Sequence, residues 1–532
     1  MSTRDKSPSY RFFNGSIVTM DPYDAVAGEV ITKGNEIVWV GRQGDAPTEY
    51  RRAKPVDLKG RLLLPAFSDC HTHFLFFALT LFKVNLRGAP SLGAALGRIA
   101  AHVSQSHGNH GWVIGDGFDV NLWGGKWPTK QHLDKILPDR PAAFFSHDEH
   151  SLWVNSVALK RAGITTATPD PEGGRILRGA DGQPTGILQE TAYRPVLRVF
   201  PKLSQRRSEQ LIETSQKTAH AQGVAAIGDM GDAAALRAFQ GLRDKHRLRL
   251  RVWKTIPLDN MEAAIIARLR SGMGDCWLKI GGVKIFLDGA LGSQTAWMLK
   301  PYTSDRENLG VCRLENSAFD RIVKRATRHG LSVCVHAIGD AAVLQAIEVL
   351  SKNRSRFPNA QPPRIEHLQL IDKTGLDKIR NCGIIASMQP SHLLTDRDYA
   401  DQHWGKRASR AFALRSLWNQ GVPMGFGSDA PIEPLAPLSG IGAAVYRSRP
   451  DDRRGSWYPK EHLTPWEAIW GFTAGAALAA GDATTRGMIR PGMLADLVVL
   501  DRNILICPPK KIFDTNVAMT FVDGMRVFDA EE

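Results

Sequence analysis

The sequence has few cysteines, no long apolar run and no block of basic residues, and each absence excludes a class of protein. Only six of the 532 residues are cysteine, with no C-x-x-C pair, which indicates reduced thiols rather than a disulfide framework. The apolar stretch FLFFALTLF at 74–82 is far shorter than the ~20 residues that span a bilayer. The opening MSTRDKSPSYRFF has no apolar region typical of a secretory signal. We therefore expect a cytoplasmic protein with no membrane partner.

The net charge of +14 raises the question of nucleic-acid binding. The basic residues are scattered, however, and in the densest stretch, RSRPDDRRG at 447–455, acids dilute them. We interpret the charge as a solvated basic surface and expect no nucleic-acid partner. A composition of 43% hydrophobic and 23% charged residues is that of a globular protein. The length predicts two domains, or one large barrel with additions.

Both ends of the chain read as short β-strands separated by turns. Near the start, Asn14-Gly15 and Gly34-Asn35 lie between alternating segments, a pattern typical of hairpins. The C-terminal stretches GMIRPGMLADLVVLDRN and VAMTFVDGMRVFD have the same character. We predict one composite β-sandwich domain from residues 1–63 and 485–532, because chain ends often lie close together.

The middle of the chain alternates apolar strand-like runs with amphipathic stretches, which predicts a parallel sheet with crossover helices. One strand ends at His71, and seven more follow from GVAAIGDM to VPMGFGSDAP. Eight β/α units predict an α/β fold with a (β/α)8 TIM barrel over residues 64–484. A long segment after the first strand has strands of its own. We interpret residues 100–195 as an insertion over the barrel mouth, since long excursions are often functional.

Polar residues stand at the ends of several predicted barrel strands, and strand ends converge at one mouth in such a barrel. The set comprises His71, His73, Lys284, His336, His367 and Asp429. Each alone has an ordinary explanation: H-x-H pairs are often structural, a strand lysine usually snorkels, and an aspartate after Gly-Ser is usually a turn or a cap. Their joint placement favours a shared site.

The residue types suit metal chemistry. His71 and His73 share one face of an extended strand and can bind one divalent ion. His336 and His367 add neutral nitrogen ligands suited to zinc. Asp429 can bind the metal and hold the attacking water, acting as general base and then acid, while the metal lowers the pKa of that water from about 15.7 towards ~7.

Lys284 is the unusual member, because an ammonium group repels a metal ion. Burial beside cations lowers the pKa of such an amine, and the neutral amine can take up carbon dioxide to give a carbamate that bridges two metals. Zinc is the expected metal, with manganese as an alternative; one or two ions, and carbamylation of Lys284, stay open.

The sequence resembles the amidohydrolase superfamily of metal-dependent TIM-barrel hydrolases, in particular its YtcJ-like branch, which includes N-substituted formamide deformylases. The resemblance covers nearly the whole chain. It is carried, in order, by NGSIVTMD, LLLPAFSDCHTH, HSLWVNSVAL, VKIFLDGALGSQTAWML, VHAIGDAAV, RIEHLQL, GSDAP and RPGMLADLVVLD.

The resemblance implies hydrolysis of a C–N bond, usually an amide, by metal-activated hydroxide. His71, His73, His336, His367 and Asp429 match the metal and base positions, and Lys284 stands where the superfamily often has its bridging carbamate. Members differ in metal count and in the lysine, so both points stay open.

The insertion supplies further candidates for contact with a small-molecule amide substrate. His150 and Glu190 are candidates for the pocket wall, and His150 for polarising the substrate carbonyl; core or capping roles are equally compatible. Phe118, Asp119, Trp123 and Trp127 suggest an apolar or aromatic substrate portion, although the tryptophans can equally pack the insertion.

Three functions are open at this point. The first is hydrolysis of a small N-substituted amide or formamide, and the second is hydrolysis of a cyclic amide or imide at the same centre. The third is a non-catalytic binding or assembly protein, which retention of every ligand type argues against. Enzymes of this kind are commonly symmetric, so we expect a homo-oligomer such as a dimer.

Overall fold

Three β-sheets organise the chain in the computed structural model, which describes residues 8–23, 26–50, 52–105, 111–146, 150–200, 203–358 and 361–532. The chain divides into two compact units. Unit 1 comprises Met1–Ala78 with Gln205–Glu532, and unit 2 comprises Leu79–Ser204. Within the described residues, no helix is long and apolar enough to cross a membrane.

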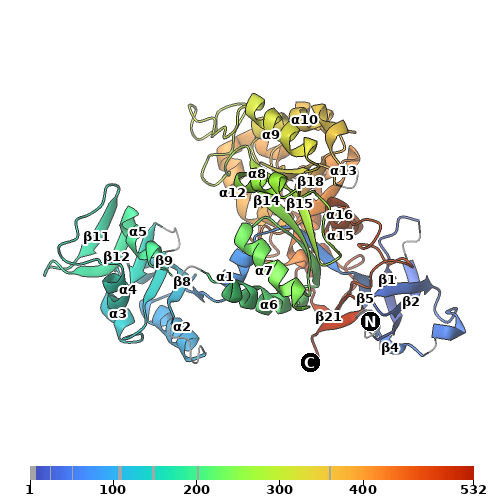
Figure 1. Cartoon of the computed structure of the whole chain (residues 1–532), viewed down its shortest axis with the longest axis horizontal. Helices are drawn as coiled ribbons and strands as arrows, with labels where there is room; N and C mark the ends of the chain where they lie inside the picture. The colour runs from blue at the N-terminus through green and yellow to red at the C-terminus, as the bar shows by residue number, and fades with distance from the viewer. Residues whose placement is uncertain are drawn as a thin grey trace. The chain divides into compact units, whose positions relative to one another are not determined.

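The central sheet of unit 1 is the predicted eight-stranded parallel barrel (Figure 1). Its strands are β6 (Phe67–Thr72), β13 (Val224–Asp229), β14 (Arg251–Pro257), β15 (Leu278–Phe286), β16 (Val333–Ala337), β17 (Arg364–His367), β18 (Ile385–Met388) and β19 (Met424–Phe426). Neighbours pair in parallel in that order. An isolated parallel bridge between Thr72 and Ala430 joins the two edge strands, so the sheet nearly closes on itself.

Helices lie between the barrel strands, and α9 shows the one-sided apolar pattern typical of a helix that covers a sheet. In α9, Phe319, Val323 and Ala326 are buried at a spacing of three or four residues, whereas charged side chains fill half of the other positions. The helices of unit 1 are α1 (Phe74–Thr80, which crosses into unit 2), α6 (Gln205–Ala221), α7 (Ala233–Asp244), α8 (Met261–Ile266), α9 (Asn316–Arg328), α10 (Asp340–Lys352), α11 (Lys373–Ile379), α12 (Leu393–Trp404), α13 (Leu414–Asn419), α14 (Pro437–Tyr446), α15 (Pro465–Phe472) and α16 (Ala474–Ala479).

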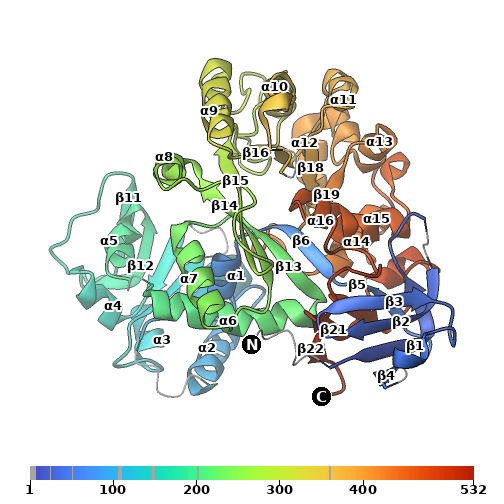
Figure 2. The same cartoon turned by 45° about the vertical axis from the view of Figure 1, so that its right-hand side comes forward.

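The two ends of the chain meet in a second sheet of unit 1. The path runs β22-β21-β20-β5-β1-β2-β3, with β4 also pairing with β1. Figure 2 shows the N-terminal strands in blue beside the C-terminal strands in red. Their bounds are β1 (Tyr10–Val18), β2 (Val26–Lys33), β3 (Glu36–Gly41), β4 (Lys54–Asp57), β5 (Leu62–Pro65), β20 (Leu497–Leu500), β21 (Val517–Val522) and β22 (Met525–Asp529).

A buried ion pair ties this terminal sheet to the barrel. Arg251 of β14 donates to both oxygens of Asp496, at 2.6 and 2.9 Å, and to Asp523 at 3.0 Å. Because breaking a buried pair leaves an uncompensated charge, such a network fixes the contact between the two sheets.

Unit 2 has a sheet of its own, in the order β11-β12-β10-β9-β8-β7. Its strands are β7 (Val84–Asn85), β8 (Val113–Phe118), β9 (Ala142–Ser146), β10 (Ser151–Val154), β11 (Gly174–Arg178) and β12 (Pro184–Glu190). The α-helices that begin within it are α2 (Leu92–Gln105), α3 (Lys130–Asp134), α4 (Ser156–Arg161) and α5 (Arg194–Arg198).

Candidate metal centre

The closure of the barrel brings the ends of β6 and β19 together, and with them three candidate ligands. The backbone N–H of Asp429 donates to the carbonyl of His71 at 2.7 Å, and that of His73 donates to the carbonyl of Ala430 at 2.8 Å. These two bonds align segments that are far apart in the sequence. They therefore place His71, His73 and Asp429 around one point.

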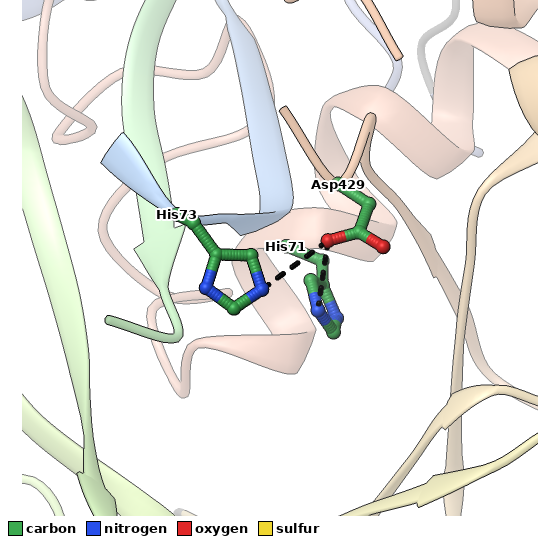
Figure 3. Close-up of side chains that lie close together, drawn as sticks. All are labelled: His71, His73 and Asp429. Carbon is green, nitrogen blue, oxygen red and sulfur yellow. Dashed lines mark ion pairs between the residues drawn. The ribbon is translucent and has the colours of Figure 1, made fainter. Parts of the chain in front are cut away.

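The three side chains converge on each other (Figure 3). Oδ1 of Asp429 lies 3.5 Å from Nε2 of His71 and 3.4 Å from Nε2 of His73. One donor atom from each lies within 4.8 Å of the other two. Two imidazole nitrogens and a carboxylate oxygen are ligands that a divalent transition metal accepts. His71 is buried, whereas 32% of the His73 side chain is exposed. The cluster of three side chains is therefore open to solvent at His73.

Backbone geometry holds Asp429 in this position. Its φ is +60°, a left-handed conformation that a non-glycine residue adopts only when its surroundings impose it. The buried carboxylate of Asp69 supplies one constraint by accepting hydrogen bonds from the N–H groups of Ser428 and His71. Burial raises the pKa of Asp69 to about 7, against the effect of these bonds.

The second ring nitrogen of His71 is engaged by Glu366 of β17. Nδ1 of His71 lies 2.7 Å from a carboxylate oxygen of Glu366, and Arg364 donates to that carboxylate at 2.8 and 3.1 Å. Nδ1–H therefore donates to Glu366, which leaves the lone pair on Nε2, the nitrogen facing Asp429. Burial, and then the charge of Lys284, lower the pKa of His71 to about 4, which favours a neutral ligand.

His336 and His367 continue the row of imidazoles beside His71. The ring centroids of His336 and His367 are 4.5 Å apart, and those of His367 and His71 are 4.9 Å apart. Nε2 of His336 lies 2.9 Å from the carbonyl of Gly289, so it carries the proton and Nδ1 keeps its lone pair. Burial lowers the pKa of His336 to about 3 and that of His367 well below its usual value.

Lys284 of β15 is fully enclosed, and its ammonium group is unsatisfied. Nζ has no hydrogen-bond partner within the described part of the chain, and burial lowers the pKa of this amine. Oδ1 of Asp429 is likewise buried and has no hydrogen bond to a described residue. A buried polar atom without a partner costs free energy, so the carboxylate oxygen of Asp429 fits a site that binds a cation, whereas the Lys284 amine suits such a site only in an uncharged or anionic form. The residues present thus suit a divalent metal.

Two residues of this centre were not predicted from the sequence. Glu366 directly precedes His367, a predicted ligand. An acid beside a histidine in a strand is the sequence feature that could have indicated a carboxylate partner for a ligating histidine. His392 follows β18 within a short 3-10 turn (Pro390–His392), and its Nε2 lies 3.9 Å from Oδ2 of Asp429. Nε2 of His392 also has no hydrogen-bond partner among the described residues. Because His392 is not at a strand end, the strand-end pattern did not reveal it.

The predicted substrate residues all lie in unit 2, in different environments. Phe118 is fully buried and stacks on Trp123 in the core of that unit, and Asp119 accepts a hydrogen bond from the N–H of Asn121. The other three line one cavity of about 580 Å³: Trp127, His150 and Glu190. Nδ1 of His150 lies 2.9 Å from Oε1 of Glu190.

Known proteins match this chain in both sequence and fold. Residues 54–528 match the model described as the amidohydrolase family. The chain is 29% identical to the putative amidohydrolase YtcJ of Bacillus subtilis, over 89% of this chain and 90% of that protein. It is 24% identical to the N-substituted formamide deformylase of Arthrobacter pascens, over 97% of each. An uncharacterized metal-dependent hydrolase from Pyrococcus furiosus superposes with a TM-score of 0.77 at 26% identity, covering 93% of this chain and 100% of that one.

Proposed function

This chain belongs to the amidohydrolase family and is a metal-dependent hydrolase of that type, and from that premise we propose that it cleaves the C–N bond of a small N-substituted amide or formamide. The observation that carries the proposal is the convergence of His71, His73 and Asp429 within 4.8 Å. The name of the deformylase relative supports the choice of bond.

The metal, which we propose is zinc with manganese as the alternative, would be held by His71, His73 and Asp429. His336, His367 and Lys284 would complete the coordination. A divalent ion bound there supplies Lewis acidity, which polarises the substrate carbonyl and lowers the pKa of a water from about 15.7 towards ~7. The neutral imidazoles favoured by burial are the form that binds such an ion.

Asp429 acts as the general base and then the general acid. The imidazoles around it lower its pKa against the effect of burial, so it is ionised at neutral pH and able to accept a proton. It takes one proton from the attacking water as the C–O bond forms. It then returns this proton to the leaving nitrogen as the C–N bond breaks, giving a carboxylic acid and an amine.

Lys284 enters the proposal as a carbamate. Its lowered pKa makes the neutral amine accessible. That amine adds to carbon dioxide with loss of a proton, and the resulting anion has the charge required of a bridge between two cations. A carbamate would also remove the unsatisfied ammonium from the buried position.

The test is a hydrolysis screen with zinc-loaded protein against N-substituted formamides, N-acyl amines, N-acyl amino acids and cyclic imides. We expect amine release from a formamide or open-chain amide, and its loss after chelation and in His73→Ala. Turnover of cyclic imides alone would favour the second function. Protein that retains no zinc or manganese, or that turns over no C–N substrate when loaded, would contradict the proposal and favour a binding role.

A further inference from the structure

Phe286 forms an exposed aromatic surface directly beside the metal centre. It ends β15, two residues beyond Lys284, and 41% of it is exposed. Its ring centroid lies 5.0 Å from that of His336 and 4.9 Å from Nζ of Lys284. An exposed aromatic ring in contact with two candidate metal-binding residues is placed to contact the substrate.

Arg313 stands on the same ring with its charge uncompensated. Its guanidinium carbon is 5.9 Å from the Phe286 ring centroid. Its backbone N–H donates to the carbonyl of Leu287 at 2.8 Å, which anchors the residue to the end of β15. The side chain is exposed, and no described residue forms an ion pair or a hydrogen bond with its guanidinium.

Asp288, which follows β15, does not neutralise Arg313. Asp288 is completely buried, and its carboxylate accepts hydrogen bonds from the N–H groups of Trp297, Ile338 and Gly339. The charge of Arg313 acts on Asp288 only as a secondary influence that lowers its pKa, after burial and these three bonds. The guanidinium therefore stays available to a ligand.

We propose that Arg313 and Phe286 form a subsite for a carboxylate carried by the substrate, so that the substrate is an N-acylated amino acid rather than a neutral amide. This inference rests on the proposed function and narrows it. A guanidinium presents a planar fork that pairs bidentately with a carboxylate. A phosphate is the weaker fit, because among the described residues no exposed cation besides Arg313 lies against this ring. The Phe286 ring offers an apolar surface to the amino-acid side chain.

The experiment compares N-formylphenylalanine with N-formylphenethylamine, which differ only in the carboxylate. We expect zinc-loaded protein to favour the first in kcat/KM. In Arg313→Met the ratio of the two kcat/KM values falls by about 10- to 100-fold, the factor expected for a lost charge-assisted hydrogen bond. Arg306→Met is the matched control, since Arg306 is exposed on the loop before Arg313, whereas the described cations over the Phe286 ring are Lys284 and Arg313. We expect this variant to leave the ratio unchanged.

The outcomes separate the two proposals. Equal turnover of both compounds by wild type, or an unchanged ratio in Arg313→Met, overturns the carboxylate subsite while the hydrolase function stands. If neither compound is hydrolysed, calorimetric binding of N-formylphenylalanine to the zinc-loaded proteins decides the subsite separately. A Kd that rises about 10- to 100-fold in Arg313→Met but not in Arg306→Met supports it, and a Kd unchanged in both variants, or no binding, overturns it.

Discussion

The carboxylate of Glu366 lies 2.7 Å from Nδ1 of His71, although the two residues are 295 positions apart in the sequence. Both side chains are almost completely buried, and Arg364 donates to both oxygens of the same carboxylate. Glu366 thus fixes which nitrogen of His71 faces the candidate metal site. It acts on the metal through His71 and is a positioning residue.

Glu366→Gln should weaken metal binding without removing a ligand. We expect the affinity for zinc to fall about 10- to 100-fold, as when the partner of a ligating histidine is lost. Competition against a chromogenic chelator measures the affinity. Glu348→Gln is the control, because Glu348 pairs with Lys378 at an exposed position. Equal zinc affinities in the two variants would show that Glu366 does not orient His71.

Asp429→Asn should abolish turnover while the protein stays folded. The amide keeps the shape of the side chain but cannot accept the proton. We therefore expect kcat to fall by about 10²- to 10⁴-fold, the typical contribution of a general base. Circular dichroism and the thermal midpoint report folding. Asp398→Asn, at an exposed ion pair with Arg454, controls for a lost surface carboxylate. Unchanged kcat in Asp429→Asn would mean that another group takes the proton.

Two buried lysines in neighbouring barrel strands differ in whether their amines have hydrogen-bond partners. Nζ of Lys254 in β14 lies 2.6 Å from the carbonyl of Gly231, 2.9 Å from that of Thr255 and 3.2 Å from Oδ2 of Asp229. Nζ of Lys284 has no such partner among the described residues. The hydrogen-bonding capacity of the Lys254 amine is therefore satisfied, whereas that of Lys284 is not.

We expect metal uptake by the apo-protein to depend on bicarbonate through Lys284. Reconstitution with bicarbonate should restore more metal per chain than reconstitution without it, and a Lys284→Ala variant should lose this difference. Metal analysis of the gel-filtered protein measures both. If bicarbonate has no effect and Lys284→Ala keeps the same metal content, Lys284 carries no bridging carbamate.

The barrel and its strand-end residues were predictable because parallel strands with crossover helices allow few arrangements. His71 and His73 share a strand face, and a polar residue at the end of a buried strand stands out against its apolar neighbours. Closure of the barrel then brings Asp429 to them without further information. The family resemblance indicated the same residues.

The contacts formed across the barrel were less predictable. The contact between Glu366 and His71 depends on how the strands stagger, and the position of His392 depends on a turn of three residues after β18. Arg313 acquires its neighbour Phe286 only because the intervening loop returns to the end of β15. Side-chain neighbours of this kind follow from tertiary packing, which no local pattern encodes.

A buried histidine away from the metal centre predicts how stability depends on pH. His220 in α6 is 4% exposed, and its Nε2–H donates to the carbonyl of Arg249 at 2.9 Å. Burial lowers its pKa from 6.5 to about 4. Between these two pH values the unfolded chain binds a proton that the folded chain does not. The free energy of unfolding therefore falls as the pH drops below about 6.5.

We expect this group to contribute a loss of about 2 kcal/mol between pH 6.5 and pH 5, at 1.36 kcal/mol per pKa unit. In His220→Gln the amide can still donate to the carbonyl of Arg249 but does not titrate, so its stability should fall less steeply over this range. Urea unfolding of both proteins at a series of pH values measures the difference. Parallel curves for the two proteins would mean that His220 is protonated as readily in the folded state as in the unfolded one. The burial of His220 would then not account for the loss of stability at low pH.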